Sequence, residues 1–310
     1  MQKRKSDEVM LTCNLTEDQL PFDLDLTLSC GQAFRWEQSS AGWTGQVNGA
    51  VVTIRQEGRS LIYNGMDEET LIRYFNLDIH VQNLLEMIRK SITRYSGKQE
   101  DSFFETAARR GAGLRIIRQD PWECLISFIC SQNSNIPTIS RRISLICRQY
   151  GKKLDDNRYG FPNPADLAVA DEGGIRTCCT GYRAPYLIRT AQAITSDPKL
   201  LARIDNLQDE DARKELMKLS GVGPKVADCV LLFAYNRYQV VPVDVWVRTI
   251  ITGRYPQVQE RKGNRKDCSY NDIAEFCRDY FGRYAGYAQQ YFFASRLSLP
   301  LDDKLNLKNI

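Results

Sequence analysis

The hydrophobic pattern of this chain changes near residue 101, and that change limits the folds it can adopt. Before it, three segments are rich in aromatic and β-branched residues and are bounded by Gly, Asn and Ser, which is typical of short strands: 33–38, 42–56 and 60–65. Asn48-Gly49 inside the second segment is the two-residue signal of a type I′ hairpin. We therefore expect an N-terminal antiparallel sheet, followed by a helix over 66–77.

From residue 101 onward, apolar residues recur at i, i+3 and i+4, which indicates amphipathic helices. The segments with this period are 101–110, 120–132, 136–151, 182–196, 209–220, 224–236, 244–255 and 269–297. Strands followed by helices favour an α+β fold, with an N-terminal antiparallel β-sheet domain and a mostly α-helical body. A length of 310 residues allows two domains, which we place at 1–112 and 113–310, the second in two lobes.

The composition excludes several classes of protein. Hydrophobic residues make up 43% and charged residues 26% of the chain, so it is neither disordered nor collagenous. No apolar run approaches the roughly 18 residues of a transmembrane helix, and the charged start MQKRKSDEVM is unlike a signal peptide. The ten cysteines show neither the paired spacing of a zinc site nor an iron–sulfur run. We expect an intracellular protein with reduced thiols.

Positive charge is concentrated in the helical part of the chain. The net charge is only +4, but 124–154 and 173–196 contain no acid, and 248–266 contains a single one. The Lys and Arg side chains of these stretches could form one phosphate-binding face. The alternative is that they lie on separate, solvated helix faces. Within the third stretch, residues 256–268 are expected to form an exposed basic loop.

The segment 216–247 carries the strongest functional signal. Gly221 and Gly223 allow a tight turn between two helices, and Pro224 suits the first position of the second helix. The free backbone amides at such a helix start can hold a phosphate without reading the base sequence. With the helical periods on either side, the turn predicts a helix-hairpin-helix DNA-backbone motif over 210–236.

Lys225 and Asp244 are the candidate catalytic pair. A cation in the first turn of a helix faces the positive end of the helix dipole, which favours the neutral amine that a Schiff-base nucleophile needs. The alternative for Lys225 is a phosphate contact, and the alternative for Asp244 is a helix N-cap. As a pair, the amine could attack C1′ of a deoxyribose while the carboxylate steadies the positive charge that develops on the sugar.

Residues 219–247 resemble the helix-hairpin-helix plus Gly-Pro-Asp element of base-excision DNA glycosylases, and the lysine–aspartate pair is similar to that of the bifunctional glycosylase/lyases. Further likeness, to the eukaryotic-type 8-oxoguanine DNA glycosylases, lies in the segments 30–36, 120–136, 181–184 and 284–289. The resemblance extends in order from about residue 20 to 298. It implies a DNA glycosylase with AP (β-)lyase activity that excises 8-oxoguanine from duplex DNA in base excision repair.

The resemblance implies a role for each residue of a base pocket. Gly31 would offer its carbonyl to the N7–H that 8-oxoguanine has and guanine lacks. Such an exchange of an acceptor for a donor at N7 lets a buried site discriminate strongly between the two bases. Phe293 and Cys229 would enclose the flipped base, while Gln289 and the Pro242 carbonyl would bind its edges. Considered alone, Phe293 and Cys229 are more typical of a core, and Gly31 of a bulge.

On the DNA side, the resemblance implies that Asn133 fills the vacated stack and pairs with the orphaned cytosine. Tyr182 would wedge beside it, and Arg183 would contact the same cytosine. Considered alone, Asn133 could simply end a helix and Tyr182 could belong to the core. Main-chain carbonyls of the hairpin would hold a structural cation, at Met217, Leu219 and Val222. No other cofactor is expected.

Two positions depart from the family pattern. Thr138 stands where the eukaryotic members have a second arginine that reads the opposite cytosine, so we expect a broader tolerance for the opposite base. Trp246 stands where they have a phosphate-contacting histidine. The only histidine, His80, lies in the N-terminal part, where we expect a structural role. The short N-terminus, without an organellar extension, points to a bacterial or archaeal source.

Two other functions stay open at this point. One is a glycosylase of the same superfamily for another oxidised or alkylated base, and the other is a non-enzymatic helix-hairpin-helix protein that binds DNA. Gly31 and Phe293 favour an oxidised purine, and the lysine–aspartate pair argues against a mere binding module. The expected enzyme is a monomer whose partner is double-stranded DNA containing an oxidised purine.

Overall fold

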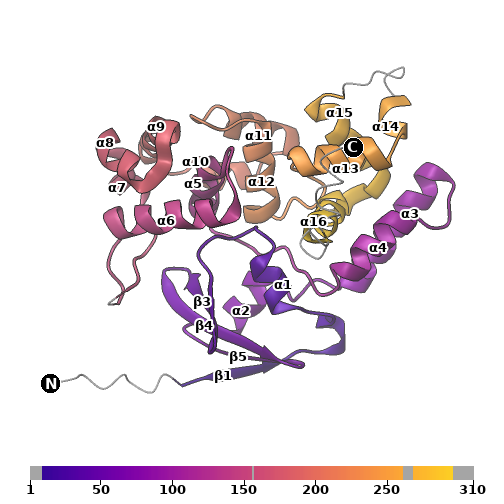
Figure 1. Cartoon of the computed structure of the whole chain (residues 1–310), viewed down its shortest axis with the longest axis horizontal. Helices are drawn as coiled ribbons and strands as arrows, with labels where there is room; N and C mark the ends of the chain where they lie inside the picture. Colours follow the sequence, from indigo (N-terminus) through magenta and orange to yellow (C-terminus); the bar gives the residue numbers. More distant parts are fainter. Residues whose placement is uncertain (1–8, 156, 261–267, 296–310) are drawn as a thin grey trace.

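The computed structural model describes residues 9–155, 157–260 and 268–295. A five-stranded antiparallel sheet comes first along the chain, and a body of helices follows, which Figure 1 shows above the sheet. The predicted α+β class, with the sheet before the helical body, is confirmed.

The sheet has the strand order β1-β5-β4-β3-β2, with antiparallel neighbours throughout. Its strands are β1 (Leu11–Asn14), β2 (Glu37–Ser39), β3 (Gly42–Val47), β4 (Ala50–Glu57) and β5 (Ser60–Asn64). The predicted hairpin at Asn48-Gly49 joins β3 to β4, with φ of 50° and 80° at the two residues. One expectation was wrong, and one strand was not expected. Residues 33–36 form bends rather than a strand, and β1 was not expected because only Cys13 of its four residues is buried.

The helices follow the predicted period from residue 101 onward, although the chain contains more of them than expected. They are α1 (Leu24–Ser29), α2 (Glu68–Tyr74), α3 (Val81–Ser96), α4 (Ser102–Arg110), α5 (Pro121–Ser131), α6 (Ile136–Tyr150), α7 (Pro164–Ala168), α8 (Glu172–Ile175), α9 (Ala184–Ser196), α10 (Leu200–Asp205), α11 (Asp209–Met217), α12 (Pro224–Ala234), α13 (Val245–Arg254), α14 (Gln257–Glu260), α15 (Tyr270–Phe281) and α16 (Ala285–Ser295).

Two of these helix predictions need correction. The segment 269–297 was expected as one helix, but Gly282 adopts a φ of 72° and separates α15 from α16. In the expected exposed loop 256–268, the short α14 forms instead and buries Val258, while residues 261–267 lie outside the described part of the chain.

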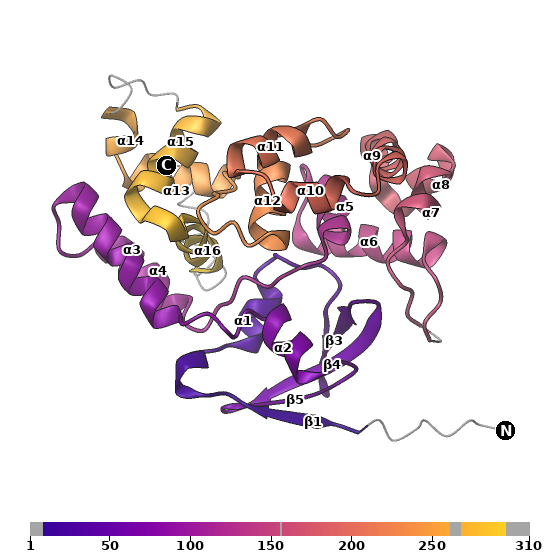
Figure 2. The same cartoon turned by 180° about the vertical axis from the view of Figure 1, so that it is seen from behind.

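Helix α12 lies at the centre of the helical body. Each residue from Val226 to Ala234 is buried, and the helix packs against α5 and α11. Phe128 of α5 stacks on Phe233 of α12, with ring centroids 5.4 Å apart and planes 11° from parallel. The helices α3 and α4 follow the sheet in sequence, yet they pack on α15 and α16 from the other end of the chain (Figure 2).

A largely buried arginine joins the sheet to the helical body. Arg35 pairs with Glu123 of α5 at 2.7 Å and donates to the Tyr159 carbonyl at 2.9 Å. Gln46 of β3 accepts from Arg35 and donates to the same carbonyl at 2.9 Å. These bonds connect β3, α5 and the loop after α6, so they fix the loop that carries Gly31 against the helices.

The ten cysteines all lie among the described residues and none forms a disulfide; nine are buried and Cys179 is exposed. Throughout the described ranges, no helix combines the length and apolar character needed to cross a bilayer. Within the same ranges, no group of three or more His, Cys, Asp or Glu side chains is placed to hold a metal ion.

Replacing Arg35 by Met should lower the free energy of unfolding by about 2–3 kcal/mol, because Glu123 and the Tyr159 carbonyl lose a charged donor in a largely buried setting. The control is Arg55→Met, which removes the exposed Arg55–Glu57 pair (42% and 60% exposed side chains) and should cost less than about 1 kcal/mol. Urea denaturation measures both changes. Equal losses in the two variants would contradict the role of Arg35 in joining the sheet to the helical body.

Candidate active site

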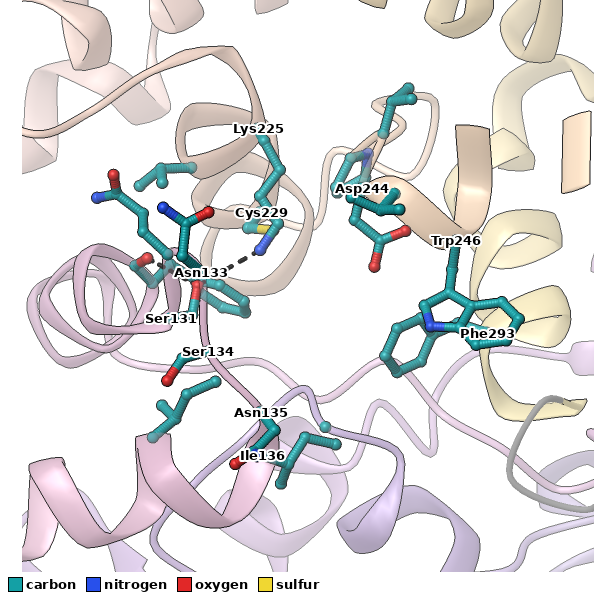
Figure 3. A pocket seen from close by; sticks show the side chains of 18 of the residues that line it. Ser131, Asn133, Ser134, Asn135, Ile136, Lys225, Cys229, Asp244, Trp246 and Phe293 are labelled. Carbon is teal, nitrogen blue, oxygen red and sulfur yellow. Dashed lines mark hydrogen bonds between the residues drawn. The ribbon is translucent and has the colours of Figure 1, made fainter. Parts of the chain in front are cut away.

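A cavity of about 1140 Å³ opens where the α5–α6 loop, the start of α12, the segment before α13 and α16 meet. Figure 3 looks into this cavity, with the Lys225 and Asp244 side chains on opposite sides of it. The predicted site residues that line it are Gly31, Asn133, Gly223, Lys225, Cys229, Pro242, Asp244, Trp246, Gln289 and Phe293.

The hairpin that carries Lys225 has the predicted geometry. Gly221 has a φ of 78°, and a Cβ there would lie 2.7 Å from Cβ of Tyr186, so the turn has room for glycine alone. The Gln132 side chain donates to the Gly221 carbonyl at 2.9 Å, which ties the turn to the end of α5. Pro224 occupies the start of α12, as predicted.

Lys225 extends from the first turn of α12 into the cavity. Its Nζ donates to Ser131 Oγ at 3.4 Å and lies 5.0 Å from the centroid of the Phe128 ring. The amine therefore has an aromatic face on one side and a hydroxyl on the other, at the edge of a large cavity. Neither Ser131 nor Phe128 was predicted as a site residue, since their contact with the lysine joins segments far apart in sequence.

Asp244 has a position compatible with both of its predicted roles. It is the N-cap of α13, where its Oδ1 accepts a hydrogen bond from Val247 N at 2.8 Å. Its carboxyl group also points into the cavity (Figure 3). The cap holds the side chain in one rotamer, so the structural and the functional interpretation describe the same conformation.

Four of the residues predicted to contact a base line the cavity, with Cys229 beside Lys225 and Phe293 on the opposite side (Figure 3). Cys229 is 2% exposed, and burial raises the pKa of its thiol to about 11, so the thiol stays protonated and apolar at neutral pH. Gly31 and Phe293 are neighbours, because a Cβ on Gly31 would lie 3.5 Å from Cε1 of Phe293. Gln289 is also buried, and its side-chain carbonyl has no hydrogen-bond partner among the described residues. The cavity is thus lined by apolar surfaces on two sides and by an unsatisfied acceptor.

Gln32 fixes the main chain at Gly31, which has a φ of 81°. The Gln32 amide nitrogen donates to the carbonyls of Thr27 at 2.8 Å and Arg115 at 2.7 Å. Its amide oxygen accepts from Ile117 N at 2.9 Å. Both ends of this buried amide are satisfied. Gln32 was predicted only as part of a motif, and its position in a chain of apolar neighbours was the signal for such a role.

Asn133 and Tyr182 meet at the surface beside the cavity. Asn133 is exposed with a φ of 47°, and its amide donates to the Tyr182 hydroxyl at 3.1 Å. The Arg183 guanidinium lies 4.3 Å from the centroid of the Tyr182 ring. It is buried, however, and donates to the carbonyls of Gln132 and Thr180. Arg183 must leave these carbonyls to reach an opposite base.

Arg142, which was counted only as a basic residue, ties the two surface loops together from inside. Its guanidinium donates to the carbonyls of Cys130 and Cys179, both at 2.7 Å, and to Ser134 Oγ at 3.0 Å. Burial lowers its pKa, and the nearby charge of Arg183 lowers it further. The side chain thus connects the end of α5, the loop of Asn133 and the turn before Tyr182.

The predicted phosphate-binding face is not continuous. Arg142 and Arg183 are buried, Arg176 pairs with a glutamate of α8 at 2.7 Å, and Arg248 donates to a main-chain carbonyl. The bases at 261–266 lie outside the described residues. Charge counted along a sequence does not tell which side chains satisfy main-chain carbonyls inside the protein, so the basic stretches alone do not define such a face.

The remaining predicted residues do not line the cavity. Thr138 is in the first turn of α6, where its N–H donates to Asn135 Oδ1 at 3.0 Å. His80 is at the start of α3, with Nδ1 3.6 Å from Asp18 Oδ1. The proposed cation ligands lie at the end of α11 and in the turn after it, together with the first hairpin glycine: Met217, Leu219, Val222 and Gly221.

Two family profiles match the chain. One is that of 8-oxoguanine DNA glycosylase, N-terminal domain, over residues 12–125, and the other is that of the HhH-GPD superfamily of base excision DNA repair proteins, over residues 126–267. The N-glycosylase/DNA lyase of Saccharomyces cerevisiae is 32% identical, over 87% of this chain and 82% of the yeast protein. The N-glycosylase/DNA lyase OGG1 of Arabidopsis thaliana is 31% identical, over 88% of this chain and 77% of the plant protein.

A solved structure shares the whole fold. The Clostridium acetobutylicum 8-oxoguanine glycosylase/lyase, in complex with double-stranded DNA containing cytosine opposite 8-oxoguanine, is 34% identical with a TM-score of 0.78. The match covers 89% of this chain and 92% of the clostridial chain. The chain belongs to the 8-oxoguanine DNA glycosylase family, within the HhH-GPD superfamily of base excision repair proteins.

Proposed function

We propose that this protein is a bifunctional DNA glycosylase and β-lyase that excises 8-oxoguanine from duplex DNA. One observation carries the proposal: Lys225 and Asp244 lie on opposite sides of a cavity that Gly31, Cys229 and Phe293 also line. A nucleophile, an acid partner and an apolar slot for a planar base thus meet in one place. The relatives named N-glycosylase/DNA lyase support the same pair of activities.

The chemistry uses the amine of Lys225 and the carboxylate of Asp244. As the bond from C1′ to the base breaks, its electron pair leaves with the base, and Asp244 steadies the positive charge on the sugar. The Lys225 lone pair then forms a bond to C1′, the nitrogen loses a proton, and the C1′–O4′ bond breaks as O4′ takes up a proton, which gives a Schiff base. Removal of a C2′ proton expels the 3′ phosphate, which is the lyase step.

Base recognition would use acceptors that the fold holds rigidly. The Gly31 carbonyl would accept from N7–H of 8-oxoguanine, a donor that guanine lacks, and Gln32 holds that main chain in place. Gln289 and the Pro242 carbonyl would bind the other edges of the base, while Phe293 stacks on its face. A free acceptor on the buried Gln289 supports this assignment.

The surface beside the cavity would enter the DNA. Asn133 and Tyr182, joined by a 3.1 Å hydrogen bond, would replace the flipped nucleotide together. The amides at Gly221 and Gly223 would hold the backbone, since a Cβ at Gly223 would meet nothing within 4 Å and the main chain there is open. Trp246 would face the DNA with a neutral indole, which contributes no charge to phosphate binding.

The hairpin turn fits the proposed main-chain cation. Carbonyl oxygens are ligands that hard cations prefer, and the Leu219 carbonyl, which accepts from Val222 N at 3.2 Å, retains a second lone pair. Met217, Leu219 and Val222 would hold the ion, which would stiffen the turn that meets the DNA. The domain division at residue 112, the two lobes, the monomeric state and a prokaryotic, intracellular setting stay predictions.

The trapping experiment that tests this function compares Lys225→Gln with Lys218→Gln. Borohydride should reduce the Schiff base and cross-link the wild-type protein to a duplex containing 8-oxoguanine. Lys225→Gln should form no cross-link and lose at least about 10³-fold in excision rate, because it lacks the nucleophile. Lys218 lies on the same hairpin and pairs with Glu215, so its variant should cross-link normally. A cross-link that survives Lys225→Gln would end the proposal, and trapping only on other lesions would reassign the substrate.

The Asp244→Asn variant separates the capping role of this side chain from its proposed acidic role. Asparagine caps helices as well as aspartate does, so the free energy of unfolding should change by less than about 0.5 kcal/mol. The single-turnover excision rate should fall about 10²-fold or more, because the amide cannot balance the positive sugar. Thermal unfolding and excision of 8-oxoguanine measure the two effects. A normal rate in a normally folded variant would show that Asp244 only caps α13.

Thr138 should allow excision opposite several bases. Because one bidentate arginine contact supplies about 1–3 kcal/mol of base discrimination, its absence should keep the preference for cytosine below about a hundredfold. The measurement is single-turnover excision of 8-oxoguanine opposite each of the four bases. Thr138→Arg is the matched variant and should raise the preference about tenfold. A preference of a hundredfold or more in the wild type would contradict the expectation.

A further inference from the structure

At the edge of the cavity, three side chains from different helices form a largely buried triangle of an aspartate, an arginine and a tyrosine, of which Tyr270 also lines the cavity. Asp228 of α12 is 3% exposed, with Oδ1 3.1 Å from Arg213 Nε of α11. Its Oδ2 accepts a hydrogen bond from the Tyr270 hydroxyl of α15 at 2.6 Å. The Arg213 guanidinium also lies 5.2 Å from the centroid of the Tyr270 ring. A buried carboxylate requires charged and hydrogen-bonded partners, so each member holds the other two in place.

The Tyr270 hydroxyl reaches from this triangle to the segment that carries Asp244. It accepts a hydrogen bond from Val243 N at 3.1 Å. Val241, Pro242 and Val243 belong to no helix or strand, so no regular ladder holds them. The bond from Val243 N therefore fixes the main chain one residue before Asp244.

The same bond sets the direction of a carbonyl. Val243 N–H and the Pro242 carbonyl belong to one peptide group, and in the described chain the only cis peptide is Leu20-Pro21. In a planar trans peptide, N–H and C=O point in opposite directions. With its N–H bonded to Tyr270, this peptide must turn the Pro242 carbonyl away from that hydroxyl.

We propose that Tyr270, held by Asp228, is a positioning residue that aims the Pro242 carbonyl and sets Asp244 for the glycosylase step. This inference rests on the function proposed above and adds side chains that are not among the proposed base contacts. Asp228 lies on α12 with Lys225, so the triangle also ties the helix of the nucleophile to the segment of the acid.

The strength of this tie depends on the charge of Asp228. Burial raises the pKa of Asp228 to about 6, a shift that Glu210 increases and that Arg213, Tyr270 and Arg278 oppose. Asp228 also borders a second cavity of about 430 Å³, whose other charged side chains are Asp209, Glu210, Arg213, Arg278 and Arg283. Above this pKa the carboxyl group is ionised and accepts the hydrogen bond from the Tyr270 hydroxyl. Below it the carboxyl is neutral, and the tie weakens.

The first test compares Tyr270→Phe with Tyr280→Phe. Tyr280 lies on the same helix, and its hydroxyl donates to Asp101 at 3.1 Å, outside the cavity. Tyr270→Phe should lower the single-turnover excision rate of 8-oxoguanine about tenfold, while cleavage of a preformed abasic site and the Kd for DNA stay within about threefold of wild type. Tyr280→Phe should keep all three values, whatever stability it loses.

The outcomes of this comparison separate the inference from the function. A wild-type protein that neither excises nor cross-links would overturn both. An active wild type with an unchanged rate in Tyr270→Phe would overturn only the inference. An equal loss of base excision and abasic-site cleavage would do so as well, because a positioning role for the Pro242 carbonyl acts on the base.

The second test uses Asp228→Asn and does not depend on the folding of Tyr270→Phe. Asparagine imitates the protonated carboxyl, so the variant should resemble the wild type below the pKa of Asp228. The ratio of wild-type to variant excision rate should be about tenfold near pH 8 and should approach one near pH 5. Taking the ratio cancels the titration of groups common to both proteins. A ratio that does not change with pH would overturn the proposal.

Discussion

Helix α12 is apolar along nearly its whole length, and the helical body packs around it because such a helix must be buried on every side. Its first turn opens into the cavity, which Cys229 and Phe233 further along the helix also line. Gly223 and Lys225 therefore present free backbone amides and one amine at the same place. Burial of a single helix thus creates both the proposed anchor for the DNA backbone and the proposed nucleophile.

The cavity is built from main-chain segments that buried polar side chains hold from behind. Gln32 fixes the segment of Gly31, Tyr270 fixes the peptide after Pro242, and Arg142 fixes the loop of Asn133. Each of these side chains uses at least two hydrogen bonds to connect separate elements. A carbonyl held in this way cannot turn to suit a different base, and such rigidity is what electrostatic recognition requires.

The sequence predicted the parts of the site that depend on local rules. Two glycines and a proline at fixed spacing predicted the hairpin, and a cap position predicted the conformation of Asp244. It did not predict contacts between distant segments, such as those of Tyr270 or Ser131. For a related reason, the charge pattern did not tell which arginines are buried. The burial of an arginine depends on which carbonyls the fold leaves without partners.

The pairing of α3 and α4 with α15 and α16 has a consequence for the synthesis of the protein. Gln289 and Phe293 belong to α16, the last described helix, which packs on α4 from the first third of the chain. During translation, α4 leaves the ribosome long before its partner does, and contacts of such long sequence separation form late. The proposed slot for the base is therefore completed only after α16 has been synthesised.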